Sequence, residues 1–220
     1  MKINSIEIIT SGFVECKSCF YSVHDTITIP TQFKFNTGAH LLTGEIDSGI
    51  FAISYLISMK SQVKKYAIIL DPVEVKINGK ESTLEELEKY ACYIDKSNKN
   101  FSKKKTIREQ IEENIKERNL NMTAEQIRDM FFITDFRFEN PITAVGNERL
   151  QAMAAIGFSQ GKQIFCFPWL SHSRFEGYAI RMEKLFEIFK KIGAIAIVPK
   201  GYDMMKAVYG KTSFFSENLS

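Results

Sequence analysis

The sequence has no hydrophobic run long enough to cross a membrane. Its most apolar stretches, residues 50–59 and 192–198, fall short of the ~20 residues that a membrane span needs. The first ten residues hold no basic region followed by a long apolar run, so we expect no signal peptide. These absences predict a cytoplasmic protein that reaches the inner face of the cell membrane only through a partner.

A strong charge of one sign is also missing. Lys and Arg number 29 against 26 Asp and Glu, which gives a formal net charge of +3. Dedicated nucleic-acid binders usually carry a stronger basic bias, so we expect no nucleic-acid partner. The Lys-rich stretch 96–105 is expected to be a solvated loop face.

Cysteine is scarce, with four residues. Cys16 and Cys19 form a CxxC, but no second pair of ligands follows at the spacing of a zinc site. Four cysteines in a chain of 220 residues also do not indicate a disulfide framework. We therefore expect buried apolar thiols and no metal site.

What is present is the composition of an ordinary globular protein, with 45% apolar and 25% charged residues. Strand patterns dominate the first part of the chain, and helical patterns alternate with short apolar strands in the rest. The expected strands are 3–10, 24–35, 39–43, 66–70, 73–77, 91–94, 163–167 and 194–198. The expected helices are 50–59, 83–90, 106–119, 123–132, 148–157 and 175–192. This order predicts an α/β fold whose parallel sheet is covered on both faces.

A glycine-containing loop, Gly44 to Gly49, joins the predicted strand 39–43 to the predicted helix 50–59. Its two glycines match the spacing of the phosphate-binding pattern G-x-x-x-x-G-K-[ST]. Ile50 stands where that pattern has Lys, and Phe51 where it has Ser or Thr. The bare glycine spacing is also typical of an ordinary strand-to-helix turn. The candidate cofactor-binding residues are Gly44, Ser48 and Gly49.

From residue 3 to about 205, the order and spacing of several segments resemble the nucleotide-binding domain of ABC transporters. The segments that carry the resemblance are Gly44–Phe51 at Walker A, Asp95 at the Q-loop Gln, Ala144–Gln151 at the LSGGE-x-Q signature, Gln163–Trp169 at Walker B, Leu170–Ser173 at the D-loop and Ile195–Lys200 at the switch strand. The resemblance implies a P-loop NTPase-like parallel-sheet core. It also implies an N-terminal antiparallel β subdomain and an inserted helical subdomain. The matching division of the chain is 1–95, 96–150 and 151–220.

The resemblance also implies which chemical groups are missing. Pro168 and Trp169 replace the Walker B Asp and the catalytic Glu, so the first offers no oxygen to Mg²⁺ and the second no titratable group. Ile50 offers no cation, and Glu45 and Asp47 add negative charge where a polyphosphate would lie. We therefore expect no ATP hydrolysis, weak or absent ATP binding, and no other cofactor.

The function that this implies is a catalytically inactive ABC-type ATPase-like subunit. It would act as an accessory or regulatory subunit beside an active ABC ATPase, a membrane permease or both, in transport or self-protection. The residues expected to face a partner are Gly146, Asn147, Glu148, Pro168 and Trp169.

Two other interpretations stay open at this point. In the first, the chain is a stand-alone binding module whose Gly44–Gly49 loop holds an anion or a partner's carboxylate. In the second, it is an enzyme of unrelated chemistry. Its candidate groups are Asp47, Asp95, His172 and Cys166.

Overall fold

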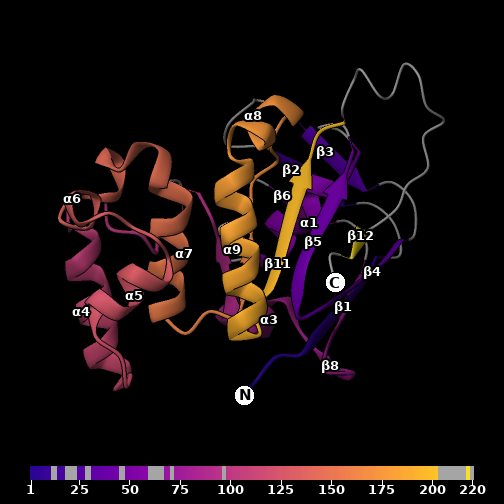
Figure 1. Cartoon of the computed structure of the whole chain (residues 1–220). Coiled ribbons are helices and arrows are strands. Elements are labelled where there is room, and N and C mark those ends of the chain that lie inside the picture. The colour runs from indigo at the N-terminus through magenta and orange to yellow at the C-terminus, as the bar shows by residue number, and fades with distance from the viewer. Residues whose placement is uncertain are drawn as a thin grey trace.

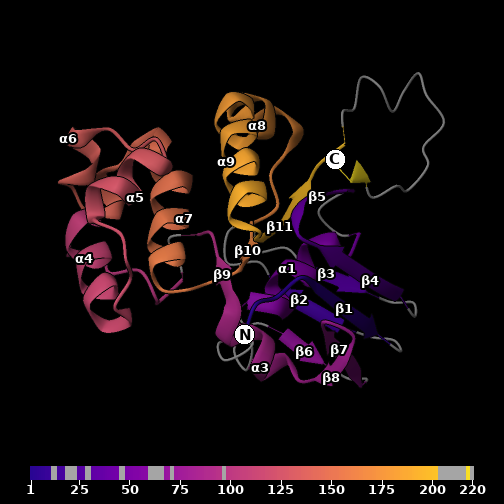
Figure 2. The ribbon, with the colours of Figure 1, turned by 60° about the horizontal axis from the view of Figure 1, so that its bottom comes forward.

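The computed structural model describes residues 1–10, 14–17, 24–27, 31–44, 48–58, 67–69, 72–95, 98–202 and 217–218. In this part of the chain, one sheet of five strands has the order β12–β5–β11–β10–β9. Figure 1 labels β12, β5 and β11 of this sheet, and Figure 2 labels β5, β11, β10 and β9. Its strands are β5 (Gly38–Thr43), β11 (Ile195–Lys200), β10 (Ile164–Cys166), β9 (Ala91–Tyr93) and β12 (Glu217–Asn218). The four neighbouring strands β5, β11, β10 and β9 run parallel to one another, and β12 lies antiparallel to β5.

Two antiparallel sheets are built from strands of the first 82 residues. The first has the order β4–β1–β7–β8, and the second has the order β3–β2–β6. The strands are β1 (Ser5–Thr10), β2 (Val14–Lys17), β3 (His24–Ile27), β4 (Thr31–Asn36), β6 (Ala67–Ile69), β7 (Val73–Ile77) and β8 (Lys80–Ser82). The turn between β7 and β8 holds Asn78 and Gly79 at φ 52° and 76°, as an Asn-Gly hairpin turn requires. The fold is therefore mixed α/β, with a parallel and an antiparallel part, as predicted.

Apolar side chains cover both faces of the parallel sheet, because residues along a strand alternate between the faces. Ile195 and Ile197 belong to the core that includes helix α1 (Ile50–Ser58). Ala196 and Val198 belong to a second core, which includes helix α9 (Ala179–Ile192). The prediction of a sheet covered on both faces is confirmed.

The other helices that the structure describes lie between β8 and β11 in the chain. They are α3 (Leu84–Tyr90), α4 (Ile107–Arg118), α5 (Ala124–Met130), α6 (Asp135–Phe138), α7 (Arg149–Ser159) and α8 (His172–Gly177). Thr106 and Thr123 begin α4 and α5 with reciprocal capping boxes, which confirms the predicted starts. Helices α4 to α7 gather on one side of α9 in both views (Figure 1 and Figure 2). Their apolar residues share one continuous core with β10 and α9, and the division at residues 95 and 150 stays a prediction.

One predicted helix is wrong in its extent. The segment 175–192 is two helices, α8 and α9, separated at Tyr178. The hydroxyl of Ser171 accepts the N–H of Arg174 at 3.4 Å and begins α8 three residues early. The end of the segment is as predicted, because Gly193 adopts φ 67° directly after α9.

Candidate functional site

The Gly44–Gly49 loop begins where β5 leaves the parallel sheet. The N–H of Gly44 donates to the carbonyl of Lys200 at 2.9 Å, so the loop starts bonded to the end of β11. Gly49 is buried at φ 85°, a conformation that favours glycine, and α1 begins at the next residue. Glu45 and Asp47 lie outside the described residues, and their predicted charge effect stays a prediction.

The candidate cofactor-binding residues of this loop lie close together. A Cβ placed on Gly44 would clash with the Ser48 Oγ and would lie 3.1 Å from the Ile50 Cδ1. Such contacts leave no room for a side chain at this position unless the neighbours move. Ile50, at the position that the phosphate-binding pattern reserves for Lys, therefore lies against the first glycine.

Trp169 occupies the space beside the start of the loop. Its indole Nε1–H donates to the carbonyl oxygen of Gly44 at 3.1 Å. A Cβ on Gly201 would lie 2.9 Å from the Trp169 Cζ2, so the chain after β11 passes directly against the indole. The ring also packs on the core that includes α1. One side chain thus connects the ends of β5, β10 and β11.

Lys200, the last residue of β11, interacts with helix α8. The Nζ of Lys200 lies 3.8 Å from a carboxylate oxygen of Glu176 and 4.4 Å from the ring centroid of Phe175. Both partners belong to α8, so Lys200 connects the end of β11 to the helix that follows the Walker B-like segment.

The signature-like segment folds as two short 3₁₀ turns before α7. Gly146 adopts φ 60°, and a Cβ there would lie 3.0 Å from an Nη of Arg137. Asn147 is exposed. The Glu148 carboxylate accepts the N–H of Thr134 at 3.0 Å and its hydroxyl at 3.1 Å. Glu148 is therefore bonded within the chain, next to the start of α6.

A cavity of about 320 Å³ brings together four of the five residues expected to face a partner. Gly146 and Asn147 line one side, and Pro168 and Trp169 line another, whereas Glu148 does not line it. Asp95, only 6% exposed, lies on the cavity wall. The Q-loop-like, signature-like and Walker B-like segments therefore meet at one cavity.

Three polar residues of this cavity escaped the sequence analysis. They are Arg149, Arg174 and Tyr178. Arg149 lies inside the signature-like segment, directly after Glu148, so a count of the charged residues within the motifs would have included it. Tyr178 gave no signal, because its position depends on the break between α8 and α9.

The thiols of Cys92 and Cys166 are buried and difficult to ionise. Burial raises the pKa of Cys92 to about 12, and it also raises the pKa of Cys166 well above its ordinary value. A thiolate is the reactive form of cysteine, so burial opposes a nucleophilic role for Cys166. Within the described ranges, no group of three or more His, Cys, Asp or Glu is placed to hold a metal ion.

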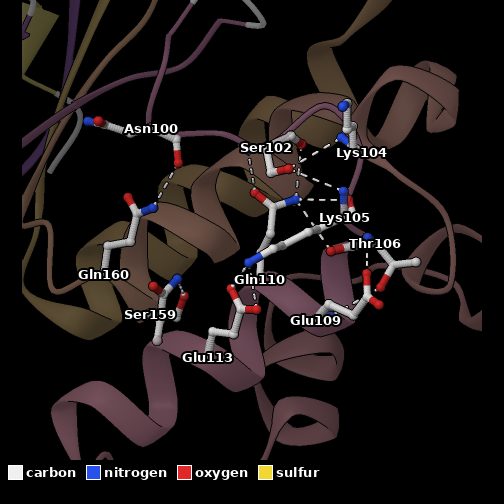
Figure 3. Close-up of polar contacts among 11 residues, drawn as sticks. Asn100, Ser102, Lys104, Lys105, Thr106, Glu109, Gln110, Glu113, Ser159 and Gln160 are labelled. Carbon is white, nitrogen blue, oxygen red and sulfur yellow. Dashed lines mark hydrogen bonds and ion pairs between the residues drawn. The ribbon is translucent and has the colours of Figure 1, made fainter.

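The described part of the Lys-rich stretch is fixed to α4 (Figure 3). The Gln110 Oε1 accepts the N–H of Ser102 at 2.8 Å, and its Nε2 donates to the carbonyl of Lys105 at 3.1 Å. Lys105 pairs with Glu113 at 2.6 Å, and Phe101 is buried in the core.

Among the described helices, none combines the length and apolar character of a membrane span.

No protein-family model matches the sequence, and no curated protein sequence matches it. Solved structures do match, and three of them come from ABC transporters or ATP-binding cassettes. A bacterial Atm1-family ABC exporter with ATP bound aligns over 94% of this chain at 11% identity and a TM-score of 0.56. The ATP-binding cassette MJ0796, in a dimeric post-hydrolysis state with ADP and Pi, aligns over 97% of this chain and 99% of its own, at 12% identity and a TM-score of 0.59.

A third match is cbiO1 from Clostridium perfringens, part of the ABC transporter complex cbiONQ. It aligns over 91% of this chain and 80% of its own, at 13% identity and a TM-score of 0.55. The chain spans about a third of the exporter chain, of which 36% is covered. The fold is therefore that of ABC nucleotide-binding domains, as the resemblance predicted, and identities this low show the fold alone.

Proposed function

We propose that this chain is a catalytically inactive ABC-type ATPase-like subunit. It pairs with an active ATPase, a membrane permease or both, in a transport or self-protection system. The fold supports this proposal, because the chain has the architecture of domains that serve such systems. A fold does not fix a function, so the argument depends on the groups around the loop.

The observation that carries the proposal is the position of Trp169. Its indole donates to Gly44 at the start of the loop, where phosphoryl transfer would need room for a polyphosphate and its Mg²⁺. Ile50, Pro168 and Trp169 bring neither a cation, nor an oxygen ligand, nor a general base. Loss of one important electrostatic contact typically slows an enzyme by about 10²–10³-fold. Several such losses together leave a folded domain without ATPase activity.

The fold that remains still supports pairing with another subunit. MJ0796 is dimeric, and cbiO1 is part of a transporter complex. Gly146 and Asn147 are exposed beside the cavity, where a partner subunit can approach them. In this proposal, α4 to α7 form the inserted helical subdomain. The chain is cytoplasmic and is held at the inner membrane face through its partner.

An ATP titration tests the loss of nucleotide chemistry. Purified protein is titrated with ATP, with and without Mg²⁺, and binding is followed by the fluorescence of Trp169 and by calorimetry. Trp169 is the single tryptophan of the chain, so its emission reports directly from the loop. We expect no binding up to millimolar ATP. The Ile50→Lys variant, which adds the missing cation, is the matched comparison and is expected to bind ATP more tightly than the parent.

ATP binding that Mg²⁺ tightens would contradict the proposal, as would turnover lost in Glu148→Ala or Trp169→Ala. Turnover that persists in both variants identifies a contaminating ATPase. Pairing is tested separately by purifying the tagged chain from detergent-treated membranes of its source cells. An ATPase with an intact phosphate-binding lysine is expected to co-purify. Recovery of the chain alone as a monomer would refute the pairing.

A further inference from the structure

The cavity beside Trp169 has the size of a small ligand site. Its volume of about 320 Å³ falls at the lower end of the range for small-molecule pockets, roughly 300–1,000 Å³. Its walls come from the end of β9, the start of α7, the segment after β10, and α8. Elements far apart in the sequence therefore converge on one space at the edge of the parallel sheet.

One charged side chain on the cavity wall is incompletely bonded. Arg149 is half-buried, and in the described part of the chain its Nε is buried with no hydrogen-bond partner. A buried donor without an acceptor costs free energy, and each such group in a folded protein requires an explanation. That Nε is itself closed to a ligand, so an oxyanion in the cavity would pair with the Arg149 guanidinium through its other nitrogens.

The other lining residues define the rest of the ligand. Arg174 is the second arginine of the wall, and Asp95 is the single carboxylate, so the charged groups leave an excess of one positive charge. A guanidinium matches the planar geometry of a carboxylate or a phosphate. The remaining wall is largely apolar or aromatic. It includes Trp169, Met153, Leu150 and Pro168.

We infer that this cavity binds a small organic anion. Its oxyanion head, a carboxylate or a phosphate, bonds to Arg149, and its aromatic or aliphatic body lies against Trp169 and Met153. This inference does not depend on the proposed function, because it needs neither an ATPase partner nor a permease. A ligand here would change the surroundings of Gly146 and Asn147, so it would bear on any surface that they form.

The test uses the single tryptophan as a reporter. In a ¹⁵N–¹H correlation spectrum, the indole N–H of Trp169 gives the one tryptophan side-chain signal of the chain. The protein is titrated with benzoate and with phenyl phosphate, which distinguish the two head groups. Phenol supplies the body alone, and acetate and inorganic phosphate supply the heads alone. At least one of the two complete probes is expected to shift the indole signal saturably and to bind more tightly than phenol, acetate or phosphate.

Substitutions then locate the binding. Arg149→Gln is expected to weaken the complete probe by about tenfold or more, and Arg149→Lys by less, because a charged hydrogen bond is worth that much. Arg181→Gln removes a charge from α9 that does not line the cavity, and it should leave binding unchanged. An indole signal that keeps its position in unliganded Arg149→Gln shows that the fold is intact.

Three outcomes would overturn the inference. The first is the absence of any saturable shift with either complete probe. The second is unchanged affinity in both Arg149 variants. The third is equal binding of phenol or of a bare anion, which would mean that the head and the body do not act together.

Discussion

The indole N–H of Trp169 donates to the carbonyl oxygen of Gly44 across 125 residues of sequence, at 3.1 Å. The bond joins the segment after β10 to the end of β5, although β11 lies between these two strands in the sheet. The apolar part of the ring packs on the core beside α1, while its nitrogen binds the loop. Trp169 is therefore a structural connection between the loop and the sheet, at the position that the sequence resemblance predicts for the catalytic Glu.

Two replacements of Trp169 should destabilise the fold to different degrees. Trp169→Phe removes the donor and leaves the Gly44 carbonyl without it, at an expected cost of about 1–2 kcal/mol. Trp169→Ala also removes the ring from a partly buried site, at an expected cost of about 2–4 kcal/mol. Urea unfolding followed by circular dichroism measures both, since neither variant retains a tryptophan to report by fluorescence.

Phe136 provides the matched control for these variants. Its side chain is 74% exposed, so Phe136→Ala should change the unfolding free energy by no more than about 0.5 kcal/mol. Equal effects of Trp169→Phe and Phe136→Ala would show that the bond to Gly44 contributes nothing to stability.

Local patterns in the sequence account for most of the elements. The Thr106 and Thr123 capping boxes need only residues within one helical turn, so these helix starts were predictable. The buried strands 163–167 and 194–198 likewise indicated a parallel sheet. The break at Tyr178 was missed, because the sequence 175–192 has an otherwise continuous helical pattern.

The site was less predictable, because its parts meet through the strand order of the sheet. The loop glycines were candidates from their spacing, and the Walker B-like segment was a candidate from the family resemblance. Nothing local indicated that Trp169 binds Gly44, or that Arg149 lines the same cavity as Asp95. The hydrogen bond from Thr134 to Glu148 also spans 14 residues and follows no helical spacing. Glu148, which was expected to face a partner, is therefore bonded within the chain.

The tight packing at Gly44 leads to a second prediction. Gly44→Ala should cost about 1–2 kcal/mol, because its Cβ would clash with the Ser48 Oγ and would lie 3.1 Å from the Ile50 Cδ1. Removing that oxygen with Ser48→Ala should reduce the cost of Gly44→Ala by about 0.5 kcal/mol or more. A double-mutant cycle of unfolding free energies measures this coupling, and strictly additive effects would show that Ser48 is not the obstacle.

The buried thiols should resist chemical modification in the folded protein. In a Cys16→Ser, Cys19→Ser variant only Cys92 and Cys166 remain, and both have raised pKa values because burial disfavours their thiolates. A disulfide reagent at mildly alkaline pH should label neither thiol in the folded state and both in guanidinium chloride. Rapid labelling under native conditions would contradict the buried positions.

The raised pKa of Cys92 also predicts a loss of stability in alkali. The unfolded thiol ionises above its ordinary pKa of 9.0, whereas the folded thiol stays protonated until its pKa of about 12. The unfolded state then binds fewer protons, so the free energy of unfolding falls as the pH rises through this window. Cys92→Ala should show a smaller fall than the parent. An identical pH profile would show that Cys92 does not contribute.

Arg108 connects three helices of the α4–α7 group, and its loss should change the response to acid. Its Nε donates to Glu139 at 2.7 Å, it also pairs with Glu125, and its guanidinium lies 4.7 Å from the ring centroid of Phe138. The hydrogen bond from Arg108 lowers the pKa of Glu125. A lowered pKa stabilises the fold above the ordinary carboxyl pKa, and this stabilisation is lost as the pH falls. Arg108→Gln should therefore unfold at a lower temperature near neutral pH, with a smaller further decrease in acid.

The contrast with Lys105 makes the Arg108 test specific. Lys105 and Glu113 also form an ion pair, but their side chains are 48% and 51% exposed, whereas Arg108 is 28% exposed. Solvent and salt screen exposed pairs, so Lys105→Gln should leave the melting temperature and its pH dependence nearly unchanged. Melting curves of both variants from neutral to acid pH, at low and at high salt, separate the two cases. If the two variants respond alike, the Arg108 cluster is an ordinary set of surface charges and the junction of α4, α5 and α6 depends on its apolar core alone.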